Sequence, residues 1–190
     1  MKNKMYGPRR GVFLDRDGVI NKTFMRDGFP YPPATLNDFE FLPGIGDVCS
    51  AFKKAGFLVV VVTNQPDVGR GLQKREIIEA MHEEIKRHLP IDALEVCYDA
   101  NDDSEFRKPK PGMVFKAARA HGIDLKRSYL IGDRWRDIDC GHAAGCRTIL
   151  LDHGYRETLN LKPHYTVSNL EEAMRTVLDG TEGLENDAGL

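Results

Sequence analysis

The 190-residue chain predicts an α/β protein with a mainly parallel central sheet, on the strength of two patterns and its length. Short β-branched runs alternate with stretches of helical spacing, as in strands that are joined by crossover helices. The run 58–62 is apolar at every position, which is typical of a central strand buried on both faces. The length suits one well-packed domain and is too short for two of ordinary size. We therefore expect a single three-layer domain without a large cap domain.

Strands are expected where apolar runs end at a polar motif, over 12–14, 58–62, 94–98, 128–131 and 147–151. Helices are expected over 45–55, 73–88, about 111–122, 137–144 and 170–178. Pro111 occupies a first helical position, and Gly56 and Gly122 end their helices. The irregular stretch 21–42 predicts a flap beside the first strand. The domain should span 1–180, and the polar stretch 181–190 predicts a disordered tail.

The composition of the chain limits the kinds of molecule that it is expected to bind. A net charge of -2 provides no overall basic field for nucleic acid, so a small anionic metabolite fits better. No apolar run is long enough for a membrane span, and the basic start lacks the apolar segment of a signal peptide. The four cysteines show no metal-binding spacing and should be reduced and structural. We expect a cytoplasmic protein that is a monomer or a weak dimer.

Asp15 and Asp17 stand two residues apart where the first strand should end. This arrangement suits phosphoryl transfer, because Asp15 can attack phosphorus while Asp17 protonates the departing oxygen and later deprotonates a water. Gly18 keeps the turn open beside them. Taken alone, the same residues also fit an Asx-rich surface turn. The other strand ends decide between these interpretations.

Two further strand-end motifs bring hydrogen-bond donors and a positive charge. Thr63 and Asn64 follow the most apolar strand and can donate to a phosphate, although a helix cap or turn would have the same residues. Lys108 lies in the proline-stiffened segment RKPKPG, where a fixed ammonium can neutralise a transferring phosphoryl group. A bare basic loop is the alternative.

The last strand-end motif supplies carboxylates for a metal. Asp133 ends its strand and can hold Mg2+ together with Asp15, because this hard ion prefers oxygen ligands. A cation there would reduce the repulsion between an attacking carboxylate and a phosphate. Asp137 is a further ligand or an orienter of Lys108, and an N-capping aspartate is the alternative.

The strings FLDRDG, VVVTNQ, RKPKPG and IGDRWRD occur in this order, each at a strand end or just before a helix. The chain thereby resembles the haloacid dehalogenase (HAD) superfamily of phosphohydrolases, which implies a Rossmann-like fold and an aspartyl-phosphate intermediate. The resemblance implies Asp15 as nucleophile, Asp17 as general acid/base, Thr63 and Lys108 as phosphoryl stabilisers, and Asp15, Asp17 (through its carbonyl) and Asp133 as Mg2+ ligands.

The longer strings DRDGVIN, VVVTNQ, RGL and RKPKPGM resemble the branch of D,D-heptose 1,7-bisphosphate phosphatases and histidinol phosphatases, over about 11–178. This resemblance implies removal of the 7-phosphate from D-glycero-D-manno-heptose 1,7-bisphosphate, with Asn64 and Arg107 contacting the substrate. Histidinol phosphate or another small metabolite is the alternative substrate. A catalytically silent binding protein is the non-enzyme alternative, and nucleic-acid end processing is disfavoured by the missing basic stripe.

The chain departs from this branch in two loops. Members often carry a zinc loop of the form CxH…CxCRKP, of which only Cys97 remains here, so we expect no zinc. The flap is longer than usual and carries Arg26, which could grip a second anionic group together with Arg107. Trp135 could wall the pocket or pack under the last helix.

Overall fold

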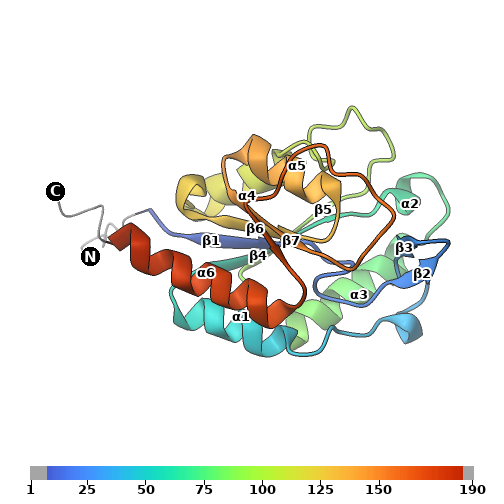
Figure 1. Ribbon diagram of the computed structural model, residues 1–190. Helices are drawn as coiled ribbons and strands as arrows, with labels where there is room; N and C mark the ends of the chain where they lie inside the picture. Colours follow the sequence, from blue (N-terminus) through green and yellow to red (C-terminus); the bar gives the residue numbers. More distant parts are fainter. Residues whose placement is uncertain (1–7, 186–190) are drawn as a thin grey trace, which may run out of the picture.

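A six-stranded parallel sheet forms the middle layer of the molecule (Figure 1). The structure is a computed structural model and describes residues 8–185. The strands follow the order β5-β4-β1-β6-β7-β8. Their bounds are β1 (Gly11–Leu14), β4 (Leu58–Asn64), β5 (Ala93–Cys97), β6 (Tyr129–Gly132), β7 (Arg147–Leu151) and β8 (Tyr165–Val167). Because the strands run parallel, their carboxyl ends meet at one edge, and the central β1 delivers Asp15 to the middle of it.

Helices cover both faces of the sheet (Figure 1). One face carries α1 (Ile45–Lys54), α3 (Arg75–His88) and α6 (Leu170–Glu185), and the other carries α4 (Gly112–His121) and α5 (Trp135–Ala144). The alternation within β4 shows why the strand is apolar throughout: Val59 and Val61 pack into one core, and Val60 and Val62 into the other. The predicted three-layer fold without a large cap domain is confirmed.

The five expected strands and five expected helices are all present, with bounds that differ by a few residues at most ends. The flap 21–42 is more regular than expected. It contains a hairpin of β2 (Phe24–Arg26) and β3 (Phe29–Tyr31), followed by the single turn η1 (Leu36–Asp38). Asp27 and Gly28 form its tip with φ of 53° and 85°. An Asp-Gly pair is a strong hairpin signal, but strands of three residues are too short to show a period.

Three other short elements were not expected from the sequence. They are α2 (Pro66–Gly69), the turn η2 (Leu125–Arg127) and the edge strand β8. Each is three or four residues long, so neither a helical nor a strand period can develop within it. Of these, α2 matters for function because it directly follows the strand end that carries Thr63.

The final helix extends further than the expected 170–178. α6 continues to Glu185, so 181–185 are helical, and 186–190 lie outside the described residues. Gly180 does not end the helix. A Cβ at this position would lie 2.3 Å from the hydroxyl of Tyr129, so the glycine permits a close approach of the helix to the sheet.

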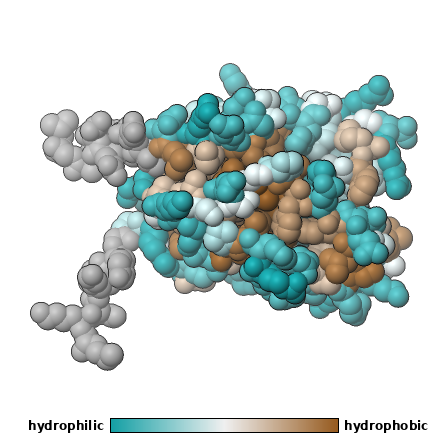
Figure 2. All heavy atoms as spheres, turned by 90° about the horizontal axis from the view of Figure 1, so that it is seen from below, coloured by the Kyte–Doolittle hydropathy of each residue, from teal (hydrophilic) through white to brown (hydrophobic). Residues whose placement is uncertain are grey.

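Apolar side chains are exposed on the hairpin, namely Phe24, Met25, Phe29 and Tyr31. Figure 2 shows apolar surface among the charged side chains of the face seen from below. Within residues 8–185, no helix has the length and apolar character needed to span a membrane. All four cysteines are buried free thiols, as expected for structural residues.

Candidate active site

A cavity of about 310 Å³ opens at the carboxyl edge of the sheet. Its deep part is formed by the ends of β1, β4 and β6 and by the segment that carries Lys108. Its rim comes from α2, the start of α5 and the hairpin region. The lining includes Asp15, Asp17, Lys108, Asp133 and Asp137 in the depth, and Thr23, Pro30, Pro32, Arg70, Arg107, Arg134 and Arg136 around them. The cavity thus gathers the predicted motifs from distant parts of the chain.

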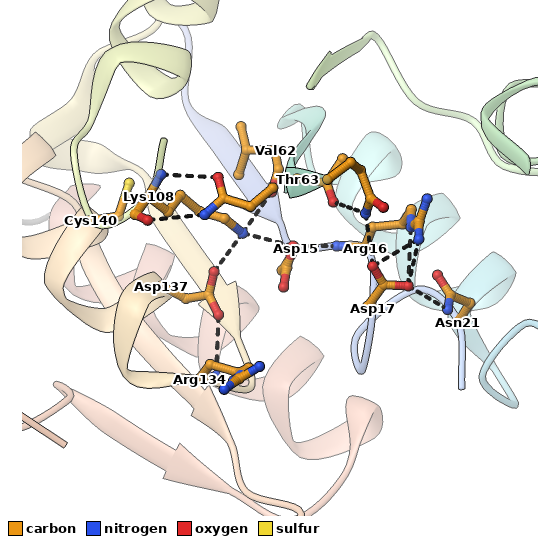
Figure 3. A network of polar contacts seen from close by, with 12 residues as sticks. Asp15, Arg16, Asp17, Asn21, Val62, Thr63, Lys108, Arg134, Asp137 and Cys140 are labelled. Atoms are coloured by element: carbon orange, nitrogen blue, oxygen red, sulfur yellow. Dashed lines mark hydrogen bonds and ion pairs between the residues drawn. The ribbon is translucent and has the colours of Figure 1, made fainter. Parts of the chain in front are cut away.

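Asp15 continues the line of β1, because its backbone N–H still donates to Ile131 of the neighbouring strand at 3.0 Å. Its Oδ1 accepts from the Arg16 backbone N–H at 2.7 Å and pairs with the Lys108 ammonium at 2.7 Å (Figure 3). Both of these contacts are made by the same oxygen, Oδ1. Burial and the charge of Asp137 raise the pKa of Asp15 to about 7, against the opposing effect of Lys108.

Lys108 is buried and its ammonium is fully engaged (Figure 3). Nζ donates to the Val62 carbonyl at 2.9 Å and pairs with Asp137 at 2.6 Å, in addition to Asp15. These contacts use the three donors of an ammonium. Burial disfavours the charge, but Asp137 and Asp15 outweigh it and raise the pKa of Lys108 above its usual value. The positive charge is therefore fixed in position beside Oδ1 of Asp15.

Asn64 holds the backbone of Lys108 from the side. Its Nδ2 donates to the Lys108 carbonyl at 2.9 Å, and its Oδ1 accepts from the Lys108 N–H at 3.0 Å. Asn64 also lines the cavity, but both ends of its amide are used in this clamp. Thr63 is buried at the same strand end, and its hydroxyl accepts from Gln65 Nε2 at 2.9 Å.

Asp133 is buried with two unpartnered oxygens. Neither Oδ1 nor Oδ2 has a hydrogen-bond partner among the described residues. Burial first, and then the charges of Asp15 and Asp137, raise its pKa well above the usual value. Gly18 makes this position possible, because a Cβ there would lie 1.9 Å from Asp133 Oδ2.

These residues fit a divalent cation. Asp15, Asp133 and Asp137 each present a carboxylate oxygen within 4.8 Å of the other two. Three carboxylates face the single ammonium of Lys108, so the ionised cluster carries excess negative charge. Oxygen ligands of this kind suit Mg2+, and a cation would provide the partner that Asp133 lacks. The predicted carbonyl ligand from Asp17 stays a prediction.

A buried arginine that was not expected from the sequence binds the carboxylate of Asp17. Arg16 is fully buried, and its Nη2 donates to both carboxylate oxygens of Asp17 at 2.8 Å (Figure 3). Asn21 and Gln65 donate to the same carboxylate at 2.9 Å each. Burial opposes the charge of Asp17, but Arg16 and these hydrogen bonds outweigh it and lower the pKa of Asp17. The only available signal was the residue order DRDGVIN itself.

The predicted substrate-contacting arginines fall in different places. Arg107 lines the cavity, with its Nε donating to Asp102 at 2.8 Å. Arg26 is on β2 with its guanidinium 5.2 Å from the centre of the Tyr31 ring, and it is not among the residues that line the cavity. Trp135 also does not line it, and its ring carries the guanidinium of Arg136.

A parallel sheet with this cluster at its carboxyl edge defines a phosphohydrolase of the HAD class. A family model described as HAD-hydrolase-like matches residues 105–173. The D-glycero-alpha-D-manno-heptose-1,7-bisphosphate 7-phosphatase of Burkholderia mallei is 37% identical over 155 residues, which cover 75% of this chain and 79% of that protein. The D-glycero-beta-D-manno-heptose-1,7-bisphosphate 7-phosphatase of Yersinia pestis is 32% identical over 153 residues, which cover 74% of this chain and 78% of that protein.

Solved structures agree with these sequence matches. The crystal structure of D,D-heptose 1,7-bisphosphate phosphatase from B. bronchiseptica, complexed with magnesium and phosphate, aligns with a TM-score of 0.76 at 28% identity, over 90% of this chain and 99% of that one. That from Burkholderia thailandensis aligns with a TM-score of 0.61 at 25% identity, over 91% and 99%. The chain belongs to the HAD superfamily, in the family of these heptose-bisphosphate phosphatases, and it is a phosphoric monoester hydrolase.

Proposed function

We propose that this protein removes the 7-phosphate from D-glycero-D-manno-heptose 1,7-bisphosphate. The observation that carries the proposal is the buried cluster of Asp15, Lys108 and Asp133 in a chain whose relatives, at 31–37% identity over about three quarters of its length, are named for this reaction. The relatives carry names for both anomers of the substrate, so the proposal covers both.

The proposed reaction has two steps. Oδ2 of Asp15 forms a bond to the phosphorus of the 7-phosphate while the bond from phosphorus to the sugar oxygen breaks, and Asp17 donates a proton to that oxygen. Water then attacks the aspartyl phosphate, Asp17 takes its proton, and inorganic phosphate leaves with Asp15 restored. The ionised Asp17 suits the second step. A phosphate dianion bound nearby would raise its pKa and so favour the protonated form that the first step needs.

Lys108 and Thr63 serve the transferring group in this proposal. The Lys108 ammonium stands 2.7 Å from the attacking carboxylate and can neutralise charge that develops on the phosphoryl oxygens. In the proposal the Thr63 hydroxyl, whose oxygen accepts from Gln65 Nε2, donates to the phosphoryl group from the neighbouring strand end. Asn64 acts through Lys108 by holding its backbone, and it lines the cavity where the substrate would bind.

Mg2+ is the proposed cofactor, held by Asp15, Asp133 and the Asp17 carbonyl, with Asp137 beside them. When bound it lowers the repulsion between the Asp15 carboxylate and the phosphate and orients the phosphoryl oxygens. We propose that no structural zinc is bound. The Cys97 sulfur faces oxygens of Asp99 and Ser104, each at 4.0 Å, rather than the further sulfur and nitrogen ligands that zinc needs.

Cytoplasmic location and a monomeric or weakly dimeric state complete the proposal. Four buried free thiols fit a reducing compartment.

The test is phosphate release across a panel of sugar monophosphates and bisphosphates with Mg2+, including both heptose anomers and histidinol phosphate. The 1,7-bisphosphate should give the highest kcat/KM, and Asp15→Asn should abolish turnover. A preference for histidinol phosphate would replace the proposed substrate. Binding without turnover by the wild type would identify a catalytically silent protein, and full activity of Asp15→Asn would refute the nucleophile.

A further inference from the structure

Four arginines line the cavity around the reacting residues, and they are not equivalent in charge. Arg134 is neutralised by Glu157, whose two carboxylate oxygens accept from its Nε at 3.1 and 3.2 Å. Arg70, the residue that follows α2, pairs with Asp67 of that helix at 3.0 Å. Each of these two arginines therefore has a carboxylate of its own.

Arg107 and Arg136 share a single carboxylate. Arg107 Nε donates to Asp102 Oδ1 at 2.8 Å, and Arg136 Nη1 approaches the same oxygen at 3.5 Å. Two guanidiniums thus face one negative charge, which leaves one positive charge uncompensated. The Arg107 side chain is 6% exposed, whereas that of Asp102 is 71% exposed. Arg107 is therefore the buried member of this ion pair, and the exposed carboxylate of Asp102 can easily leave the guanidinium for water.

Two other acidic side chains of the same loop have different partners. Asp99 accepts from the Ser104 hydroxyl, and Asp103 lies 3.9 Å from Lys110. Burial and the neighbouring charges of Arg107 and Arg134 lower the pKa of Arg136, against the opposing effects of Asp102 and Glu157.

Both guanidiniums are well held for recognition of an anion. Arg107 also donates from Nη1 to the Asp99 carbonyl at 3.0 Å, and the Arg136 guanidinium stacks 4.5 Å from the centre of the Trp135 ring. Guanidiniums that are fixed in this way bind phosphate oxygens with little further loss of side-chain entropy.

We propose that Arg136 joins Arg107 in a second anion subsite, which binds the non-reacting phosphate of a bisphosphate substrate, and that Asp102 occupies this subsite in the free enzyme. The inference rests on the proposed function, because it assigns a place to the substrate's second phosphate. A phosphate dianion offers more charge and more acceptor oxygens than the Asp102 carboxylate, so it displaces the loop. Arg136 is thereby a residue that selects bisphosphates over monophosphates.

The test compares heptose 1,7-bisphosphate with heptose 7-phosphate, which lacks the non-reacting phosphate. In Arg136→Ala the ratio of the two kcat/KM values should fall roughly 10-fold to 100-fold, the usual effect of losing a hydrogen-bonded charge partner. Inhibition by the product heptose 1-phosphate, which reports binding without turnover, should weaken by a similar factor. Asp102→Asn removes the competing carboxylate and should raise the ratio several-fold. Arg175→Ala, on the exposed side of α6, is the matched control and should leave the ratio at its wild-type value.

Equal losses for both substrates in Arg136→Ala, or a lowered ratio in Asp102→Asn, would overturn the subsite. Failure of the proposed function has a different signature. If the wild type prefers another bisphosphate, the same ratio is measured with that compound and its monophosphate, and a fall in Arg136→Ala supports the subsite. If the wild type prefers monophosphates throughout, or is inhibited equally by inorganic phosphate and by heptose 1-phosphate, the subsite is refuted.

Discussion

Replacing Asp133 by Asn should uncouple the stability of this protein from Mg2+. In the wild type, both Asp133 oxygens are buried without a hydrogen-bond partner among the described residues, and one of them lies within 4.8 Å of a carboxylate oxygen from each of Asp15 and Asp137. This repulsion destabilises the metal-free fold, and a cation would offset it. The variant removes one negative charge from the cluster. It should therefore be at least as stable as the wild type in EDTA, and it should gain much less stability when Mg2+ is added.

The expected size follows from binding linkage. At 100 times its Kd, a ligand that binds only the folded state stabilises it by about 2.7 kcal/mol. For a domain of this size each kcal/mol shifts Tm by about 2–4 °C, so the wild type should gain about 5–11 °C. Loss of a residue that only hydrogen-bonds to a metal ligand weakens metal binding by about 10-fold or more. Loss of a ligating carboxylate should weaken Mg2+ binding at least as much. At the same Mg2+ concentration the gain of the variant is then about 1.4 kcal/mol or less.

Thermal unfolding followed by circular dichroism, in EDTA and then in rising MgCl2, measures both gains. Asp47→Asn is the matched control, because Asp47 is exposed on α1, away from the cavity. NaCl at equal ionic strength separates binding from screening. Equal Mg2+ shifts in the wild type and in Asp133→Asn, or no shift in the wild type at millimolar MgCl2, would refute the metal assignment.

The remaining predictions concern three residues that lie beside the proposed catalytic groups, namely Gly18, Arg16 and His82. In Gly18→Ala the new Cβ would overlap Asp133, so Mg2+ affinity and kcat should both fall by about 10-fold or more. In Arg16→Lys a compact ammonium replaces the guanidinium that binds Asp17, the proposed general acid/base, so kcat should fall by about 10-fold with little change in KM. Burial and the charge of Arg16 lower the pKa of His82 to about 4. Between about pH 6.5 and 4 the imidazole is therefore protonated in the unfolded chain and neutral in the folded chain. Stability from this group is lost as pH falls through that window, by up to about 3 kcal/mol, and His82→Gln should flatten the slope in urea unfolding.

Each of these predictions has its own control. Gly56 has a positive φ of 83°, similar to the 87° of Gly18, but a Cβ added there would have open space around it. Gly56→Ala should therefore lower the stability of the protein and leave its metal affinity unchanged. Similar effects of the two glycine variants would show that backbone strain, and not the contact with Asp133, is responsible. For Arg16→Lys, an unchanged kcat would contradict the role of the bidentate contact. Parallel stability curves for wild type and His82→Gln between pH 4 and 7 would mean that the imidazole titrates normally in the folded protein.

Local sequence was enough to place the reacting groups at one edge. The strand runs that end at Asp15, Thr63 and Asp133 are local patterns, and parallel strands necessarily bring their carboxyl ends together. Lys108 was identified from its proline-rich segment, and it lies 2.7 Å from Asp15 in the structure. The sequence predicts Asp137 as a metal ligand or an orienter of Lys108, and in the structure it contacts Lys108 while presenting an oxygen to the carboxylate cluster.

Tertiary structure alone decided the partners of these groups. Nothing in the order of residues indicates that Arg16 turns back onto Asp17, that Gln65 reaches the same carboxylate, or that Arg136 shares Asp102 with an arginine 29 positions earlier. Such contacts depend on how the loops pack over the sheet, and side-chain direction in a loop has no period that a sequence can display. The sequence by itself therefore determined the fold and the reaction, while the packing of the loops decided which charges remain free to bind the rest of a substrate.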